Sequence, residues 1–234
     1  MRFDILTLFP ELITTVLASS ILGRAQSSGA IEVYAHNIRD YSQDKHRRVD
    51  DTPYGGGKGM LMAAPPIYRC IEAVKAMQES GVRRRVVYLS PCGAVFDQRK
   101  AEAFSAYDNL ILLCGHYEGV DARVLELCID EEVSVGNFVL TGGELPACMI
   151  ADAVARLLPG VLAAPECFEK ESFSDGLLEY PQYTRPYEFM GKTVPEVLLS
   201  GHHENIEKWR FMQSVEITRK KRPDLYSIWE KGER

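Results

Sequence analysis

The chain has 234 residues, of which 46% are hydrophobic and 26% are charged, so it is a globular protein with room for one large domain or two smaller ones. Its net charge of −6, from 27 basic and 33 acidic residues, excludes a protein that coats nucleic acid over its whole surface. The six cysteines are spread singly and no histidines cluster with them, so neither a disulfide scaffold nor a metal site is predicted.

The N-terminus carries no cleavable signal pattern, because Asp4 interrupts its apolar run. The sequence also lacks an apolar span of about 18 residues. We therefore expect a cytoplasmic protein that does not enter a membrane. Basic residues gather at positions 45–48, 83–85 and 219–222. These patches fit a structured anionic partner, and solvated faces explain any one of them equally well.

Short apolar strands alternate with helices through the first 160 residues. The hydrophobic pattern predicts strands at residues 2–9, 31–38, 85–89, 109–114 and 131–135. It predicts helices at residues 11–17, 20–27, 66–79, 97–106, 122–128 and 145–158. This alternation is typical of an α/β domain with a parallel sheet covered on both faces.

Residues 39–62 have no sustained period, and a polar loop of this length is usually functional or disordered. Within it, Gly55–Gly57 followed by Lys58 invites comparison with a phosphate-binding loop. The match fails because Gly59 replaces the required Ser or Thr and because no strand precedes the glycines directly. A flexible or substrate-positioning loop is the better interpretation.

The last third of the chain changes character. Residues 161–193 hold several prolines and glycines among acids, and we interpret them as an interdomain linker. Residues 194–234 are predicted to form a smaller helical domain whose main helix covers residues 203–221. The apolar face of that helix is predicted to consist of Ile206, Trp209, Phe211, Met212, Val215 and Ile217.

Three strand ends carry glycine or proline turns, at residues 89–93, 114–119 and 135–143. Ligands bind outside the carboxyl ends of strands in open α/β sheets, which favours a shared small-molecule site. Each turn alone also has a structural explanation. Glu118 and Asp121 would cap the following helix, and Thr141 or Gly142 would form a capping box with Glu144. The pattern leaves both explanations open.

Six long motifs, in this order, resemble those of the bacterial tRNA (guanine-N1)-methyltransferases, the TrmD family of the SPOUT superfamily. They are D-D-T-P-Y-G-G-G-K-G-M-L-M (Asp50–Met62), Y-L-S-P-C-G (Tyr88–Gly93), C-G-H-Y-E-G-V-D (Cys114–Asp121), E-E-V-S-V-G-N-F-V-L-T-G-G-E-L-P-A (Glu131–Ala147), D-G-L-L-E-Y-P-Q-Y-T-R-P (Asp175–Pro186) and V-L-L-S-G-H-H-E-N-I-E-K-W-R (Val197–Arg210). The resemblance covers essentially the whole chain.

The resemblance implies a SPOUT-type α/β domain at residues 1–160, with a parallel sheet and a deep trefoil knot, one of the rare exceptions to unknotted topology. It implies a homodimer with active sites at the subunit interface. It also implies methyl transfer from S-adenosyl-L-methionine to N1 of guanosine 37 of tRNA, next to the anticodon and preferably after another guanosine. That modification maintains the reading frame.

The resemblance also assigns the glycine turns to the methyl donor. Backbone groups of the turns would read the adenine edge, while apolar side chains would cover its faces. The implied donor-binding residues are Tyr88, Leu89, Ser90, Pro91, Gly115, Tyr117, Glu118, Val135, Gly136, Asn137, Phe138, Val139, Leu140, Gly142 and Gly143. No metal is required for donor binding, and the sequence leaves open whether magnesium assists the chemistry.

Two catalytic residues follow from the resemblance. Arg156 matches the arginine that stabilises negative charge developing at guanine O6, although an arginine near a helix C-terminus is commonly a partner of the helix dipole. The family's general base is an aspartate before Ser-Phe, and Glu171 stands at that place. Its side chain is one methylene longer, so our hypothesis is that the linker absorbs the extra length; Glu169 and Asp175 are the alternatives.

The tRNA contacts implied by the resemblance are Arg24 and Asp50 near the target guanine, and Lys208, Arg210, Arg219 and Arg222 on the C-terminal helix. His116 and Phe138 stand where many relatives carry arginine and tyrosine. Two other functions compete with this one. The first is a SPOUT enzyme acting on another RNA, for example a ribose methyltransferase, and the second is a non-catalytic RNA-binding module.

Overall fold

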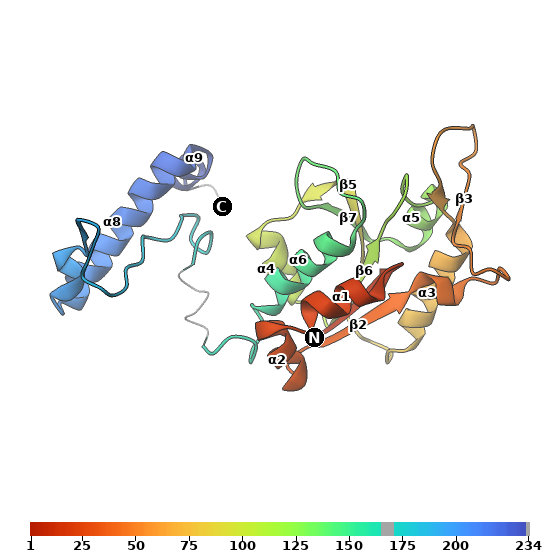
Figure 1. Cartoon of the computed structure of the whole chain (residues 1–234), viewed down its shortest axis with the longest axis horizontal. Coiled ribbons are helices and arrows are strands. Elements are labelled where there is room, and N and C mark those ends of the chain that lie inside the picture. Colours follow the sequence, from red (N-terminus) through yellow and green to blue (C-terminus); the bar gives the residue numbers. More distant parts are fainter. Residues whose placement is uncertain (165–170, 233–234) are drawn as a thin grey trace. The chain divides into compact units, whose positions relative to one another are not determined.

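The computed structural model describes residues 1–164 and 171–232 (Figure 1). The chain divides into two compact units, Met1–Ala164 and Pro165–Arg234, and each is described by itself. Along the described residues, no helix is both long and apolar enough to cross a membrane.

The first unit is built on a five-stranded sheet in the order β2-β1-β6-β5-β7. All of its neighbouring strands pair in parallel, as the alternation of strands and helices predicts. The strands are β1 (Arg2–Thr7), β2 (Glu32–Asn37), β5 (Arg84–Val95), β6 (Asn109–Cys114) and β7 (Glu131–Ser134). The central strand β6 is buried along its whole length, so both of its faces must be covered.

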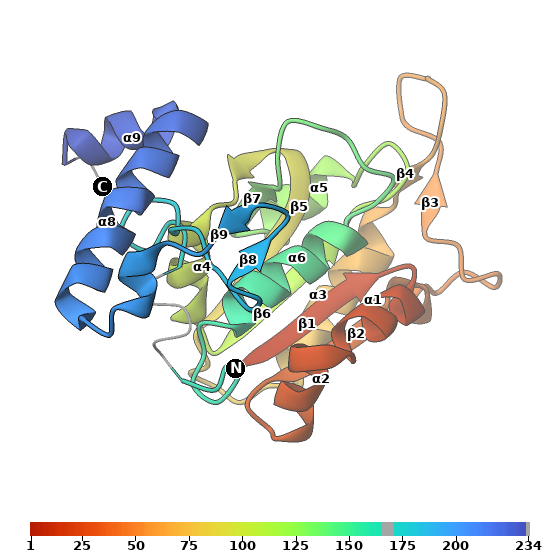
Figure 2. The same ribbon diagram turned by 60° about the vertical axis from the view of Figure 1, so that its left-hand side comes forward.

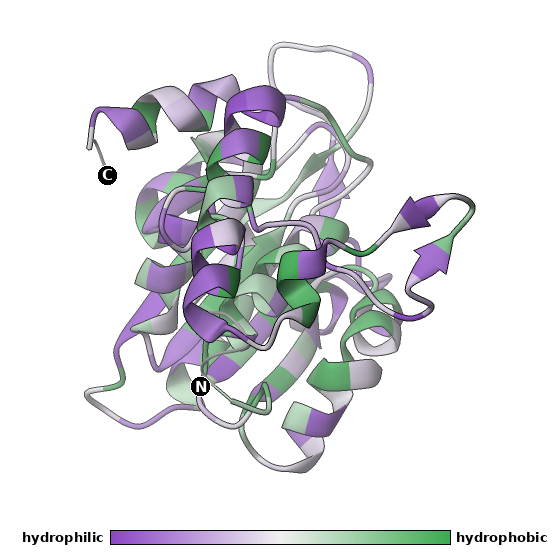
Figure 3. Ribbon diagram, turned by 90° about the vertical axis from the view of Figure 1, so that its left-hand side faces the viewer, coloured by the Kyte–Doolittle hydropathy of each residue, from purple (hydrophilic) through white to green (hydrophobic). Residues whose placement is uncertain are grey.

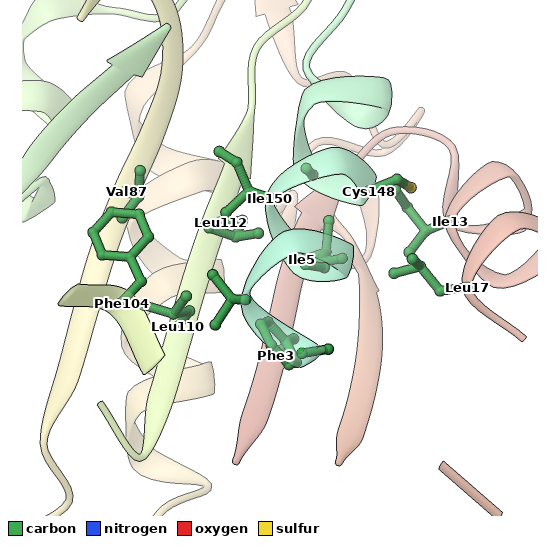
Figure 4. Packing of buried hydrophobic residues seen from close by; sticks show 14 of the residues in the cluster. Phe3, Ile5, Ile13, Leu17, Val87, Phe104, Leu110, Leu112, Cys148 and Ile150 are labelled. Atoms are coloured by element: carbon green, nitrogen blue, oxygen red, sulfur yellow. The ribbon is translucent and has the colours of Figure 1, made fainter. Parts of the chain in front are cut away.

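Helices cover both faces of this sheet (Figure 2). They are α1 (Pro10–Leu17), α2 (Ser20–Ser27), α3 (Ala64–Ala76), α4 (Gln98–Ser105), α5 (Ala122–Cys128) and α6 (Glu144–Ala155), with a short 3-10 helix, η1 (Ile38–Tyr41). On one face α1, α2, α4 and α6 pack with Phe3, Ile5 and Leu112 (Figure 4). On the other, α3 and α5 pack with Leu6, Ile111 and Leu113. Alternate residues of one strand thus enter different cores.

Strand β5 runs further than the sequence predicts. It was expected to end at Leu89, yet it continues to Val95, and its pairing with β7 shifts register between Leu89 and Ala94. Gly93 makes this possible, because a Cβ there would overlap the backbone of Glu132 and Val133. The turn that the Pro-Cys-Gly sequence suggested is therefore a bulge inside a paired strand.

The loop at residues 39–62 also contains regular structure. Strands β3 (Asp50–Asp51) and β4 (Leu61–Met62) pair in antiparallel fashion and raise the glycine-rich segment as a hairpin. Gly55, Gly56, Gly57 and Gly59 all have positive φ angles, which few other residues adopt without strain. The glycines allow the backbone of this hairpin to turn. Strand β4, not a helix, directly follows them, so they do not form a phosphate-binding loop.

A buried carboxylate lies near the amino end of the sheet. Asp4 is inaccessible to solvent and accepts hydrogen bonds from Arg2, from Asn109 at 2.7 Å and from Gln78 at 3.2 Å, with His36 Nε2 also 2.7 Å away. Burial alone raises the pKa of Asp4. The contacts with His36, Arg2 and Asn109 outweigh that effect, so the pKa lies below its ordinary value of 3.8.

We expect Asp4→Asn to lower the free energy of unfolding by roughly 3 kcal/mol at pH 7, because it leaves Arg2 and His36 without their buried anion. A lowered pKa stabilises the native state above the unfolded pKa, and the benefit is lost as pH falls through the native pKa. The difference between parent and variant should therefore shrink below about pH 4. Urea unfolding followed by circular dichroism at pH 7 and pH 3 measures it.

Asp108→Asn is the matched control, since Asp108 forms an exposed ion pair with Arg83 at 3.1 Å. Exposed pairs contribute about 1 kcal/mol or less. Equal costs for the two variants at pH 7 would show that the Asp4 contacts have no special role.

The second unit is described from residue 171 onward. It contains a hairpin of β8 (Glu188–Phe189) and β9 (Lys192–Thr193), a 3-10 helix η2 (Glu196–Leu199), and helices α8 (His203–Lys221) and α9 (Pro223–Glu230). The segment expected to be an irregular linker thus includes paired strands, and it also buries Leu177. The amide of Leu178 donates to Thr218 Oγ1 at 2.8 Å, which ties this segment to α8.

The apolar face predicted for α8 is correct only in part: Ile206, Trp209, Val215 and Ile217 are half-buried and none of the six residues is fully buried. The buried residues of α8 are Ser214 and Thr218, while Phe211 and Met212 are more than half exposed. Hydrophilic residues predominate along α8 (Figure 3). One hydrogen bond holds the helix to the rest of the unit, because Thr218 Oγ1 accepts from the Leu178 amide. The same hydroxyl donates within the helix to the carbonyl of Ser214 at 2.6 Å.

Candidate functional site

Three strand ends meet at the carboxyl edge of the sheet. Strands β6, β5 and β7 are neighbours, so the segments that follow or interrupt them lie side by side. Together they line a cavity of about 480 Å³. This volume is within the range of small-molecule sites. The three glycine turns, which were predicted to share a site, therefore line one cavity.

The cavity contains all of the residues expected to bind the donor except Asn137. Cys92, His116, Gly119 and Thr141 also line it, and they belong to the three predicted turns. Sequence reasoning missed the remaining lining residues: Val120, Leu125, Glu132, Val133, Ser134 and Pro146. Most of them lie inside the quoted motifs, and membership of a motif is the sequence feature that could have identified them. Leu125 and Pro146 lie on helices, and only the packing of those helices brings them to the cavity.

Tyr88 forms an inner wall of the cavity. Its ring is 7% exposed, and burial, with the nearby Glu132 and Cys92, raises the pKa of its hydroxyl to about 12. The hydroxyl is therefore protonated at neutral pH and can donate a hydrogen bond. A Cβ on Gly115 would lie 2.8 Å from the hydroxyl oxygen of Tyr88, so only glycine fits beside the ring.

The loop after β7 supplies apolar surface. Phe138 is 53% exposed, Val139 81% and Leu140 40%, and all three line the cavity. Gly136 has a φ of +145°, and a Cβ there would lie 2.6 Å from the Phe138 ring. The loop is anchored at its start, where Ser134 Oγ donates to the Gly136 carbonyl at 3.0 Å. These side chains form an apolar part of the cavity wall.

The glycine-rich hairpin is fastened to the cavity wall. The amide of Glu118 donates to the Met60 carbonyl, and the amide of Met62 donates to the Gly119 carbonyl, both at 3.0 Å. Asp50 pairs with Met62 across the hairpin, so it lies next to this turn. A Cβ on Gly59 would meet the Glu118 carboxylate at 2.5 Å. The hairpin and the cavity therefore form one continuous structure.

The helix-capping alternative holds for one residue only. Asp121 is the N-cap of α5, and its carboxylate accepts from the amide of Arg123 at 3.0 Å. Glu118 instead lines the cavity. Helix α6 begins after Gly143 without a side-chain cap, so the expected capping box with Glu144 does not form.

The two expected catalytic residues belong to different units. Arg156 is half-buried at the C-cap of α6, with its amide donating to the Asp152 carbonyl at 3.1 Å. Glu171 is half-buried at the start of a turn whose Ser174 amide donates to the Glu171 carbonyl at 3.2 Å. Of the alternative bases, Glu169 lies outside the described residues. Asp175 is exposed and accepts from the Leu177 amide at 3.1 Å, which is a turn-forming role.

Several of the expected tRNA-binding residues already have acidic partners. Lys208 contacts Glu204 at 2.6 Å, Arg210 contacts Glu207 at 2.7 Å, and Arg222 contacts Asp224 at 2.6 Å. Arg210 also lies over the ring of Tyr180 at 4.9 Å, so part of its role is structural. Arg24 lies in the last turn of α2. Arg219 is exposed at the end of α8, next to Lys220 and Lys221.

As a class, this is a parallel α/β protein with a cavity of small-molecule size at the carboxyl edge of its sheet, and its second unit has a helix with a basic end. The family model described as tRNA (Guanine-1)-methyltransferase TrmD matches residues 1–228. The chain therefore belongs to the tRNA (guanine-1)-methyltransferase family.

Curated relatives agree with this membership. A protein of Ruminiclostridium cellulolyticum is 58% identical over 228 residues, with 97% of each chain covered. Another from Lachnospira eligens is 57% identical over 231 residues, covering 99% of this chain and 97% of the relative. A third from Clostridioides difficile is 50% identical over 226 residues, covering 97% of each. All three bear the name tRNA (guanine-N(1)-)-methyltransferase.

Proposed function

We propose that this chain transfers a methyl group from S-adenosyl-L-methionine to N1 of guanosine 37 of tRNA, in the cytoplasm, and so maintains the reading frame. The observation that carries the proposal is the single cavity formed by three motif-bearing strand ends, in a chain of the tRNA (guanine-1)-methyltransferase family. The motif Asp50–Met62 also resembles that of the family, and it lies outside the lining of the cavity. Because this resemblance is not confined to the proposed donor site, it favours the family's tRNA substrate over another RNA.

The cavity suits the methyl donor chemically. The backbone of the glycine turns that line the cavity offers hydrogen bonds to an adenine edge, and Leu89, Val135 and Leu140 offer apolar cover for its faces. The Tyr88 hydroxyl and the Glu118 carboxylate are available for the polar groups of the ribose and the amino acid. When bound, the donor supplies an electrophilic methyl group on a sulfonium.

The chain must then position guanine N1 in line with that methyl group and remove its proton. We assign proton removal to Glu171 and stabilisation of charge at O6 to Arg156. A carboxylate is a suitable general base, and a guanidinium is a suitable partner for a developing anion because it stays charged at all relevant pH values.

We further propose a homodimer, with the trefoil knot formed within the first unit. Support for a dimer comes from an apolar surface on α1 and α6, which pack against each other. Phe9, Val16, Leu145 and Met149 are each 40–53% exposed there. Phe9, Leu12 and Val16 also line a hollow of about 400 Å³. Contiguous exposed apolar residues of this kind mark association surfaces.

The test is transfer of a labelled methyl group from S-adenosyl-L-methionine to a tRNA transcript with guanosine 37, with and without magnesium. We expect label in 1-methylguanosine and none in an otherwise identical adenosine-37 transcript. Label in a ribose of either transcript would instead identify a ribose methyltransferase. RNA binding with no transfer to any transcript would identify a non-catalytic binding module.

The basic end of α8 predicts salt-dependent tRNA binding. Replacing both Arg219 and Arg222 by alanine should weaken binding and lower the slope of log K against log salt by about 1 to 2, because each lost phosphate contact releases one fewer counterion. Affinity measured between about 50 and 200 mM salt gives the slope. The control is the double variant Arg83→Ala with Arg99→Ala, which removes the same charge from the first unit. An equal fall in its salt slope would refute the assignment of Arg219 and Arg222 to tRNA binding.

A further inference from the structure

One buried carboxylate without a role in the proposed chemistry lies next to the cavity. Glu144 is the first residue of α6 and is 4% exposed. Its Oε1 accepts a hydrogen bond from Thr7 Oγ1 at 2.6 Å, and its Oε2 lies 3.0 Å from His116 Nε2. Thr7 ends β1, while His116 lies in the turn after β6. One carboxylate thus joins three segments that are distant in sequence.

The hydrogen bonds around Glu144 are complementary. The contact between Glu144 Oε2 and His116 Nε2 is a hydrogen bond in the tautomer of His116 that carries its hydrogen on Nε2, because a carboxylate oxygen accepts. Thr7 Oγ1 donates to Glu144 and accepts from the Phe9 amide at 2.9 Å. The Phe9 ring lies against the His116 ring, with 4.9 Å between centroids. Both carboxylate oxygens of Glu144 and the hydroxyl of Thr7 therefore have hydrogen-bond partners, as a buried polar network requires.

Gly142 leaves the space that this arrangement needs. A Cβ at Gly142 would overlap both His116 Nε2 and the Glu144 carboxylate. His116 and Gly142 form a β-bridge, and the amide of Gly143 donates to the Gly115 carbonyl at 3.0 Å. The loops after β6 and β7 are thus in direct contact beside the buried carboxylate.

An acid at the N-terminus of a helix is commonly explained by the helix dipole alone. That explanation requires no partner, and it does not account for a carboxylate whose two oxygens are bound by residues of two other segments. His116, Gly142 and Gly143 all line the cavity. Any loosening at Glu144 therefore changes the distance between the cavity's two glycine walls.

We propose that Thr7, His116 and Glu144, here called the Glu144 clamp, are positioning residues that hold residues 115–119 and 136–143 at a fixed separation. The inference rests on the proposed function, because the ligand in question is the methyl donor. The clamp contributes to donor affinity by fixing the cavity before the donor arrives, so that binding does not have to order these loops.

The test is calorimetric titration with S-adenosyl-L-homocysteine, which requires no methyl transfer. His116→Ala should raise the Kd at least about tenfold, whereas His116→Gln should stay within about threefold, because its amide can still donate to Glu144. In single turnover at saturating donor, the rate of His116→Ala should remain within about threefold of the parent while the KM for donor rises. A purely structural role would lower the melting temperature and leave the Kd unchanged.

A double-mutant cycle with Glu144→Gln isolates the contact itself. His116→Ala should weaken binding less in the Glu144→Gln background than in the parent. His46→Ala, which removes an exposed histidine outside the cavity lining, is the matched control and should bind as the parent does. If His116→Ala fails to fold, Thr7→Val carries the test, since it removes only the hydroxyl and should raise the Kd by about threefold or more.

An unchanged Kd in both His116→Ala and Thr7→Val overturns the clamp, and so does a His116→Gln variant as weak as His116→Ala. If the parent itself does not bind S-adenosyl-L-homocysteine, the donor assignment fails and the clamp fails with it. The two failures are therefore distinguished by the parent's own titration.

Discussion

Replacing Glu171 by glutamine is expected to lower the rate of methyl transfer by about 100- to 10,000-fold, which is the usual contribution of a general base. Glutamine keeps the size and the hydrogen-bonding oxygen of the side chain but cannot take up the N1 proton. The measurement is single-turnover transfer to guanosine-37 tRNA at saturating donor and neutral pH. Binding of S-adenosyl-L-homocysteine should be unchanged, because the glutamine side chain has the same shape as that of Glu171.

Asp175→Asn is the matched control, since Asp175 lies in the same segment and its carboxylate accepts from the Leu177 amide, a bond that asparagine preserves. Its rate should stay within about threefold of the parent. Full activity of Glu171→Gln would exclude Glu171 as the base. A large loss in Asp175→Asn instead would transfer that role to Asp175.

Gly115→Ala should weaken donor binding by about 10- to 100-fold, because a displacement on the order of 1 Å at a reacting site has consequences of this size. The added Cβ would lie 2.8 Å from the Tyr88 hydroxyl oxygen and 2.9 Å from a ring carbon. The ring is buried and has little room to retreat. Gly115 does not adopt the left-handed backbone conformation, so the effect is steric and the backbone itself is not strained.

Titration with S-adenosyl-L-homocysteine measures this effect, and tRNA affinity should remain within about twofold. Gly81→Ala provides the contrasting control. Nothing lies within 4 Å of a Cβ at Gly81, but its φ is +91°, so the substitution strains the backbone without filling space. It should lower stability by about 1 kcal/mol and leave donor affinity unchanged. Equal donor affinity in Gly115→Ala and the parent would contradict the close-packed wall at Tyr88.

The local pattern of the sequence was sufficient for most elements of the first unit. Helix Ser20–Ser27, strand Asn109–Cys114 and helix Ala122–Cys128 have the bounds that periodicity predicts. Each is short, strongly patterned and bounded by glycine, polar residues or caps. Hydrophobic periodicity is reliable in such segments because the apolar residues that produce the period are the ones that pack against the core.

Periodicity failed where a long-range contact decided the outcome. Strand β5 passes Pro91 and Gly93 because β7 pairs with it on the far side of the bulge. The apolar residues of α8 predicted a core-facing stripe, yet Ser214 and Thr218 take the buried positions because Leu178 bonds to Thr218. The residues of β7 are distant in sequence from β5, and Leu178 is distant from Thr218. A local hydrophobic pattern therefore contains no information about either contact.

The sequence by itself determined that this chain is a parallel α/β protein with glycine turns at three strand ends, since these features depend only on local pattern and residue type. Its motifs likewise predicted the family to which it belongs. The tertiary structure decided which turn residues share a cavity. It also gave Glu144 its partners, because Thr7 lies 137 residues away and no short-range pattern encodes that distance. Asp4, which interrupts an apolar strand, is stable there only because Arg2, His36 and Asn109 surround it.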